Sequence, residues 1–331
     1  MENKSPPFDI TPDMISDIAD IAQLVGKTGG TSGLNASPVL RRANRIRTIH
    51  ASLAIEQNTL SLEQVTALLD GKLVIAPQKD IAEVKNAYEI YELMDRLDPY
   101  SMDELLRAHG VLMRGLETEA GKFRSRPVGV VDAKGSIIHF GTLPPYIDGL
   151  MSELLEWTKT DELHMLIKSC VFHYEFELIH PFADGNGRMG RLWHTLLLSK
   201  WDPVFAWLPV ETIIHDRQQE YYDAINSSND EGKSTLFIKF MLSAIKETLV
   251  KALDSSCIKS CEDSGTNKNK DNYRWSIVSE FLEKSSHITN ADLRKLLGIS
   301  PATANRVLNT FLAQGKLVRE HINGHWAYKT M

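Results

Sequence analysis

The sequence lacks the long apolar runs that mark membrane-spanning segments. None of its stretches approaches the roughly 20 consecutive apolar residues that a transmembrane helix needs. The first 13 residues are polar, contain prolines and lack the apolar core of a secretory signal peptide. We therefore expect a protein without membrane contacts.

Cysteine is scarce as well, with three in 331 residues. Three cysteines do not make a disulfide framework. Cys257 and Cys261 lie in a polar stretch without a nearby Cys/His pair, which argues against a zinc site. We expect reduced thiols and a cytoplasmic location.

The chain has no excess of positive charge. Asp and Glu number 43 against 37 Lys and Arg, which gives a net charge of -6. No global basic field is available to hold nucleic acid or an anionic membrane, so any such contact must be local.

The length of 331 residues suggests two domains. Residues 254–272 are rich in Ser, Asn, Lys and Asp, which is typical of a linker. We predict an N-terminal helical region at 1–60, a core at 61–253, this linker, and a small domain at 273–331.

Apolar residues recur mainly at helical spacing, so the predicted fold class is mainly α. The exception is 128–140, where two β-branched runs flank Lys134-Gly135 and predict a hairpin. Ser61 and Gln64 have the spacing of a capping box. Helices are expected at 11–25, from Pro38, from Leu62, and at 81–97, 102–116, 146–158, 161–179, 188–200, 220–227 and 236–253.

The densest chemistry lies between the expected helices at 161–179 and 188–200. Glycines there let the backbone approach a ligand, and N–H groups at a helix start attract anions. Two arginines three apart can reach the same phosphate, an aspartate suits Mg²⁺, and a histidine can act as a base. The simpler interpretation is a helix-loop-helix corner. The residues are His180, Asp184, Gly185, Asn186, Gly187, Arg188 and Arg191.

This segment resembles the Fic motif, His-Pro-Phe-x-Asp/Glu-Gly-Asn-Gly-Arg-x-x-Arg, with every defining position filled. The resemblance extends from about Pro38 to Leu253. It implies a Fic helical bundle with a β-hairpin flap. It also implies an enzyme that transfers AMP from ATP to Ser, Thr or Tyr hydroxyls of a protein substrate, including itself.

The resemblance assigns roles to the motif residues. His180 matches the base that deprotonates the target hydroxyl, and Asp184 matches the Mg²⁺ ligand. Arg191 matches the arginine that holds the γ-phosphate of ATP. The remaining phosphate-binding positions are Gly185, Asn186, Gly187 and Arg188.

Two further regions are similar to the family pattern. The hairpin residues Lys134, Gly135, Ser136 and Ile137 match the flap that holds the target backbone as an added strand. Tyr221-Tyr222 and Asn229 match residues that line the adenosine pocket, although a tyrosine pair on a helix also suits core packing.

His173, Glu177 and His180 share one helical face, a spacing that also suits a metal site. We interpret His173 and Glu177 instead as residues that orient the helix and the motif loop.

The stretch Ser52-Leu-Ala-Ile-Glu56-Gln57-Asn58, hereafter the inhibitory segment, resembles the inhibitory Fic motif, Ser/Thr-x-x-x-Glu-Gly/Asn. The resemblance implies that Glu56 pairs with Arg191 and restrains ATP binding. Gln57 departs from the pattern. Because glutamine is a poor residue for a left-handed helix end, the helix is expected to end at Asn58 instead.

Residues 273–331 carry eight Lys or Arg against four Asp or Glu. Three expected helices and a hairpin around Asn323-Gly324 resemble a winged helix-turn-helix. DNA contact through this domain and a docking or homodimer-forming role remain alternatives. The helices are expected at 274–284, 290–297 and 301–314, and the candidates for DNA contact are Thr303, Asn305, Arg306, Asn309 and Arg319.

Protein AMPylation with ATP and Mg²⁺ is the leading functional hypothesis. The alternatives are a DNA-binding regulator whose helical body senses nucleotide, and an enzyme that removes AMP from modified proteins.

Overall fold

The structure is a computed structural model, and it describes the main part of the chain. It divides into two compact units, Met1–Leu253 and Asp254–Met331, which are described separately below. The described residues are 5–28, 38–131, 137–263, 274–275, 277–279, 281–282, 285–297, 299–322 and 325–330.

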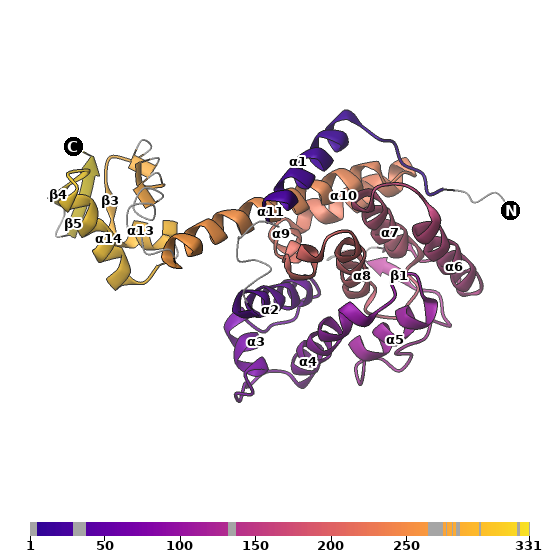
Figure 1. The fold of residues 1–331 in the computed structure, drawn as a ribbon. Coiled ribbons are helices and arrows are strands. Elements are labelled where there is room, and N and C mark those ends of the chain that lie inside the picture. Colours follow the sequence, from indigo (N-terminus) through magenta and orange to yellow (C-terminus); the bar gives the residue numbers. More distant parts are fainter. Residues whose placement is uncertain are drawn as a thin grey trace. The chain divides into compact units, whose positions relative to one another are not determined.

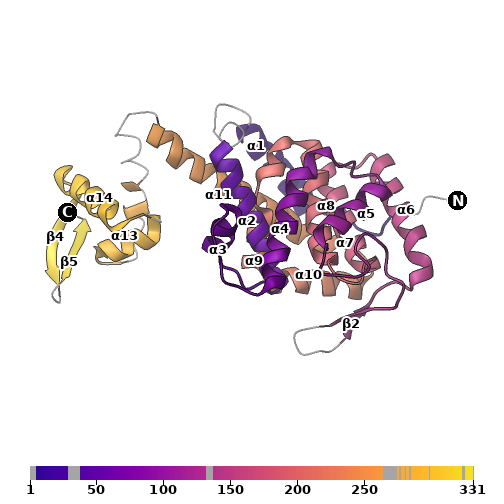
Figure 2. The same ribbon diagram turned by 90° about the horizontal axis from the view of Figure 1, so that it is seen from below.

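The first unit is built of helices around one apolar core, as the periodicity predicts (Figures 1 and 2). Its helical elements are α1 (Pro12–Thr28), α2 (Pro38–Ile55), α3 (Leu62–Leu69), α4 (Gln78–Leu93), the 3₁₀ turn η1 (Met94–Arg96), α5 (Met102–Leu112), α6 (Pro144–Thr160), α7 (Met165–Ile179), α8 (Asn186–Trp201), the 3₁₀ turn η2 (Pro203–Trp207), α9 (Val210–Asp216), α10 (Gln218–Glu231) and α11 (Thr235–Asp263), of which residues 235–253 belong to this unit.

The ends of two helices follow local capping chemistry. The predicted capping box of α3 is confirmed, since the Ser61 side chain accepts from the Gln64 N–H and the Gln64 side chain accepts from the Ser61 N–H. Proline begins α6, where its missing N–H is harmless.

Helices α7 and α8 form the centre of the first unit (Figure 1). Residues 180–185, which connect the two helices, are the motif loop. Their close approach depends on Gly190 of α8. A Cβ there would lie 2.9 Å from Glu177 Oε1 and 2.9 Å from His173 Cδ2 on α7. Only a glycine allows the two helices to pack at this distance, which fixes the motif loop against both of them.

Helix α11 continues to Asp263, so the first ten residues of the predicted linker at 254–272 are helical. The remaining residues of the predicted linker lie outside the described residues. The stretch lacks glycine and proline up to Asp263, so nothing in it stops a helix that has already formed. Polar composition alone was therefore a poor guide to the helix end.

The predicted hairpin is confirmed in its two strands. β1 (Gly129–Val131) pairs antiparallel with β2 (Ile137–Phe140), with Gly129 opposite Phe140. The predicted target-holding residues Lys134, Gly135 and Ser136 lie outside the described residues.

The described part of the second unit contains a three-stranded sheet of order β3-β5-β4 and the helices α13 and α14. Residues 274–275, 277–279 and 281–282, within the predicted helix at 274–284, are helical as well. α13 (Asn290–Leu297) matches its prediction, and Ser300 caps α14 (Pro301–Ala313) by accepting from the Thr303 N–H. The strands are β3 (Ile288–Thr289), β4 (Leu317–Ile322) and β5 (His325–Thr330), of which β3 was not predicted. The predicted turn at Asn323-Gly324 lies outside the described residues.

Throughout the described part of the chain, every helix is too short or too polar to span a lipid bilayer.

Candidate active site

The motif loop begins where α7 ends, at His180. This residue has a left-handed backbone (φ 52°), and its N–H donates to the Phe176 carbonyl over 2.9 Å. A left-handed conformation is unfavourable for a histidine, so surrounding contacts must hold it.

Arg124 supplies those contacts, and sequence reasoning missed it. Its side chain is almost fully buried, and its Nε donates to the His180 carbonyl over 2.7 Å. Its other nitrogens donate to the carbonyls of Arg126 and Thr142. The sequence around Arg124 has no motif that marks it, because its partners are backbone carbonyls and two of them, those of Thr142 and His180, are distant in sequence.

The His180 ring faces Glu177 on one side. Its Nδ1 lies 3.3 Å from the Glu177 carbonyl oxygen and 3.8 Å from Glu177 Oε2. An Nδ1–H donor on this side places the ring's lone pair on Nε2, the nitrogen that can accept a proton. The ring remains 20% exposed, so a substrate can reach it.

Glu177 lies between two histidines, with Oε1 3.8 Å from His173 Nε2. Burial raises the pKa of Glu177 to about 7, although the nearby Arg191 opposes the shift and Glu56 adds to it. The predicted orienting positions of His173 and Glu177 thus lie directly behind the motif loop.

Asn186 and Gly185 set the turn into α8. The Asn186 amide accepts from the Phe182 N–H and donates to the Phe182 carbonyl, both over 2.9 Å. This side chain therefore closes the loop on itself and does not face a ligand. Gly185 has φ 85°, and a Cβ there would lie 2.8 Å from Met113 Sδ.

Asp184 lies at the mouth of the loop with a side chain that is 48% exposed. Its Oδ1 accepts from the Gly185 N–H over 2.6 Å and from Arg188 Nη2 over 3.0 Å. His109 supports the same residue from beneath, with Nε2 3.0 Å from the Asp184 carbonyl oxygen.

His109 is a second residue that sequence reasoning missed. Its ring stacks on Phe182 with centroids 3.6 Å apart, and its Nδ1 accepts from the Gly121 N–H. Burial lowers the pKa of His109 to about 4, so the ring is neutral near pH 7 and donates to Asp184 through Nε2. A lone histidine on the expected helix at 102–116 gives no signal of this role.

Arg191 and Glu56 form the ion pair that the resemblance implies. Arg191 is 2% exposed, and its Nη2 donates to Glu56 Oε1 over 2.7 Å. Ser52 adds two acceptors, its Oγ at 3.0 Å from Nε and its carbonyl at 2.9 Å from Nη2. Burial alone would lower the pKa of Arg191, but Glu56 raises it above its usual value.

The Glu56 carboxylate lies over the first turn of α8. A Cβ built on Gly187 would overlap with Glu56 Oε1 and would come within 3.0 Å of Arg191 Nη1. The carboxylate therefore stands at a positive helix end beside a buried arginine, which is a favourable place for any anion.

The inhibitory segment ends differently from the prediction. α2 ends at Ile55, and Gln57 itself takes the left-handed conformation, with φ 67°. The Gln57 N–H donates to the Ala54 carbonyl and the Asn58 N–H to the Leu53 carbonyl, over 3.0 and 3.1 Å. These are the two bonds of a Schellman cap, and they hold glutamine where glycine is preferred.

Gln57→Gly is expected to raise the free energy of unfolding by about 1 kcal/mol, because it relieves the left-handed strain of a side chain that is exposed. Urea unfolding of the full chain measures the change. Gln57→Ala is the control and should bring no gain, since alanine also disfavours this conformation. Equal stabilities of the glycine and alanine variants would contradict a strained cap.

The three residues predicted for the adenosine pocket lie in different surroundings. Tyr221 is 2% exposed, and its hydroxyl lies 3.1 Å from His173 Nε2, so it belongs to the core. Its neighbour Tyr222 is 38% exposed. Asn229 is half-buried and accepts from the Tyr174 hydroxyl over 2.8 Å. The flap residue Ile137 begins β2.

Comparison with known proteins identifies the family. Residues 99–198 match the model of the Fic/DOC family. The chain is 33% identical over 215 residues to the protein adenylyltransferase fic-1 of Caenorhabditis elegans, covering 59% of this chain and 39% of that one. It is 28% identical over 222 residues to the protein adenylyltransferase Fic of Nematostella vectensis, covering 63% and 49%. The chain thus spans less than half the length of these two relatives.

Solved structures agree. The crystal structure of a Fic family protein from Desulfovibrio desulfuricans G20 has a TM-score of 0.74 and 39% identity, covering 99% of this chain and 98% of that chain. A Fic-1 fragment from C. elegans shares the fold at 20% identity, with a TM-score of 0.61, over 73% and 72% of the two chains. Since the match to the Desulfovibrio protein extends over nearly all of both chains and includes the loop that carries His180 and Arg191, this chain belongs to the Fic family.

Proposed function

We propose that this chain is a protein adenylyltransferase that transfers AMP from ATP to a protein hydroxyl, and that Glu56 restrains it. The observation that carries the proposal is the anion position at the start of α8. There the Glu56 carboxylate lies against Gly187 and pairs with the buried Arg191. A phosphate group would bind at the same position, because it too is stabilised by a helix N-terminus and by an arginine.

In the proposed reaction, His180 takes the proton from a Ser, Thr or Tyr hydroxyl of the target. The oxygen forms a bond to the α-phosphorus of ATP, the bond from that phosphorus to the bridging oxygen breaks, and pyrophosphate leaves. Arg191 would hold the γ-phosphate once Glu56 has released it. Such transfer depends mainly on positioning and on stabilisation of charge. The phosphates would lie against the N–H groups of Gly185, Asn186 and Gly187, with Arg188 beside them.

Asp184 fits a magnesium ion that is shared with the phosphates. It offers a hard carboxylate oxygen on a side chain that is half-exposed at the mouth of the loop. Among the described residues, no group of three His, Cys, Asp or Glu side chains could hold a metal by itself. A Mg²⁺ ion here would take its other ligands from phosphates and water and would neutralise their charge.

The adenosine is proposed to lie along α10, near the exposed ring of Tyr222 and the half-buried Asn229. Tyr221 would support this wall from the core through its contact with His173. The target backbone is proposed to pair with the hairpin of β1 and β2, at Lys134, Gly135, Ser136 and Ile137.

The test is incubation of the full chain and a protein target with Mg²⁺ and ATP labelled in either the α- or the γ-phosphate. We expect only the α-label to become attached to protein, together with a mass increase of one AMP. Attachment of the γ-label would indicate a kinase. Absence of both labels, in wild type and in a Glu56→Gly variant that is folded, would contradict the proposal.

Related measurements distinguish the other predicted functions, which are removal of AMP and DNA-binding regulation. Loss of AMP from a modified target would indicate removal of AMP as the main activity. Salt-dependent binding of DNA without any transfer would favour a regulator. Its predicted contacts include Arg306 on α14 and Arg319, whose guanidinium stacks 3.4 Å from the Trp326 ring centroid. The homodimer and the cytoplasmic location also stay predictions.

A further inference from the structure

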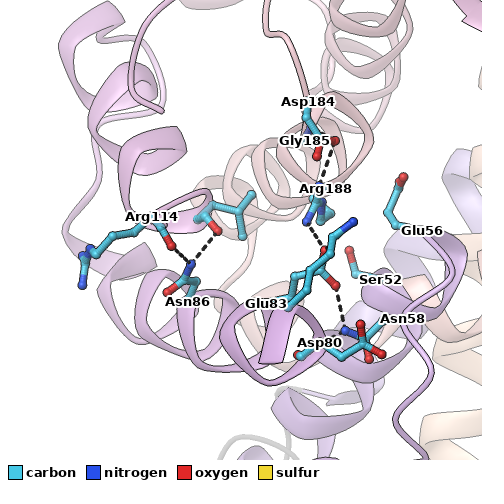
Figure 3. Close-up of polar contacts among 12 residues, drawn as sticks. Ser52, Glu56, Asn58, Asp80, Glu83, Asn86, Arg114, Asp184, Gly185 and Arg188 are labelled. Atoms are coloured by element: carbon cyan, nitrogen blue, oxygen red, sulfur yellow. Dashed lines mark hydrogen bonds and ion pairs between the residues drawn. The ribbon is translucent and has the colours of Figure 1, made fainter. Parts of the chain in front are cut away.

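A buried carboxylate outside the motif connects two parts of the site. Glu83 lies on α4, and its side chain is 5% exposed. Arg188 Nη1 donates to Glu83 Oε1 over 3.1 Å, and Asn58 Nδ2 donates to Glu83 Oε2 over 2.7 Å. Lys79 Nζ lies farther away, 3.9 Å from Oε1. Figure 3 shows the carboxylate between the arginine and the amide.

On one side the connection reaches the motif loop. Arg188 is 4% exposed and donates to Asp184 Oδ1 through Nη2 as well as to Glu83 through Nη1. Its Nε is buried without a hydrogen-bond partner among the described residues. The two carboxylates therefore fix the direction of a guanidinium that still has a donor unsatisfied.

On the other side the connection reaches the inhibitory segment. Asn58 follows Glu56 by two residues, and its N–H closes the cap of α2 by donating to the Leu53 carbonyl. Its side chain also donates to the Asp80 carbonyl over 3.2 Å, and the Thr59 N–H donates to Asp80 Oδ2. The first turns of α4 thus hold the segment that carries Glu56.

We propose that Glu83 is a positioning residue that joins the inhibitory segment to the phosphate-binding arginine. Its carboxylate orients Arg188 toward the phosphates and, through Asn58, keeps Glu56 on Arg191. This inference rests on the proposed function, because it assigns Glu83 to the same site.

Burial strengthens the contacts that Glu83 makes with Arg188 and with Asn58. A buried pair that loses one partner leaves a charge without compensation, so Glu83 and Arg188 stay together as long as both are charged. Because one carboxylate serves both neighbours, a ligand that shifts Arg188 also alters the acceptor of Asn58. The coupling is reciprocal. If nucleotide binding loosens the inhibitory segment, then loosening the segment changes the nucleotide affinity by the same free energy.

Asn58→Ala removes the contact on the inhibitory side and leaves the Glu83–Arg188 pair intact. We expect the rate of AMP transfer in the otherwise wild-type chain to rise roughly fivefold, because this factor corresponds to the net free energy of one hydrogen bond. In a Glu56→Gly background the same substitution should add nothing, because no carboxylate remains to be held.

Asn86→Ala is the matched control. Asn86 lies on α4, as Glu83 does, and is buried. It donates from Nδ2 to the carbonyls of Leu112 and Arg114 over 3.1 and 2.9 Å (Figure 3). Its loss should lower stability without raising transfer. Equal effects of Asn58→Ala and Asn86→Ala, or a rise that persists in the Glu56→Gly background, would overturn the inference.

Glu83→Gln tests the contact between Glu83 and Arg188. The amide oxygen can still accept from Asn58, but the charge that holds Arg188 is lost. In the Glu56→Gly background we expect the KM for ATP to rise roughly tenfold while kcat changes less than about threefold. A lower melting temperature with an unchanged KM would indicate a structural role only and would overturn the assignment.

Hydrogen exchange separates this inference from the proposed function, because it needs no transfer activity. The backbone amides at positions 57 and 58 should exchange faster in Asn58→Ala than in wild type, and at the wild-type rate in Asn86→Ala. If all variants lack transfer but the exchange follows this pattern, the proposed function fails while the connection through Glu83 stands. Unchanged exchange in Asn58→Ala refutes the connection.

Discussion

Glu56→Gly is expected to raise AMP transfer by roughly ten- to a hundredfold, the range of a hydrogen bond between charged groups. In wild type, Arg191 Nη2 is engaged by Glu56 at 2.7 Å, and the carboxylate overlaps with any group placed at Gly187. Removing the side chain frees both the arginine and the first turn of α8. Initial rates with ATP and Mg²⁺ measure the change.

The control for Glu56→Gly is Glu92→Gly. Glu92 also pairs with a buried arginine, Arg45, at 3.1 Å, but it lies at the end of α4 away from the motif loop. Its loss should leave transfer unchanged when the rates are compared at equal folded fractions. A folded Glu56→Gly chain that is no faster than wild type would show that the ion pair does not restrain transfer.

His180→Ala, made in the Glu56→Gly background, is expected to lower kcat by 10²- to 10⁴-fold, the range for loss of a general base. The KM for ATP should change far less, because the phosphates are held by α8 and its arginines. The melting temperature should stay close to that of the parent, since the backbone at 180 is fixed by Arg124 and not by the ring.

His215→Ala serves as the histidine control. His215 lies on α9 with a side chain that is 39% exposed and 3.7 Å from its neighbour Asp216. Its replacement should leave kcat unaltered. If His180→Ala retained full transfer, the proton would have to go to another acceptor, and the proposed mechanism would be wrong.

The sequence predicted the helical fold and the motif loop well, because both depend on local patterns. Helical spacing found the helices of the first unit except the short α9, which was not predicted. The Ser61 and Ser300 caps start where the side chains predict. The ion pair of Glu56 and Arg191 was predicted through the family motif, although 135 residues separate the two.

The residues that support the site could not be predicted from the sequence. Arg124 and His109 act on backbone carbonyls of the motif loop, and Glu83 accepts from two segments that are distant in sequence. Such contacts exist only once the helices have packed, and a single arginine, histidine or glutamate within a helix or loop has many ordinary uses. The burial of Tyr221 is likewise not visible in a local pattern, and its role in the adenosine pocket stays a prediction.

Because residue 190 has no side chain, α7 and α8 lie close together, and their spacing sets the positions of His180 and Arg191 relative to each other. His180 stands at the end of α7, and Arg191 is the neighbour of Gly190 on α8, where the two helices nearly touch. A single methyl group at 190 would act as a wedge between them, and it would move the base and the arginine apart together. A substitution at Gly190 would therefore disturb the proposed transfer, although residue 190 itself contacts neither nucleotide nor target in the proposed reaction.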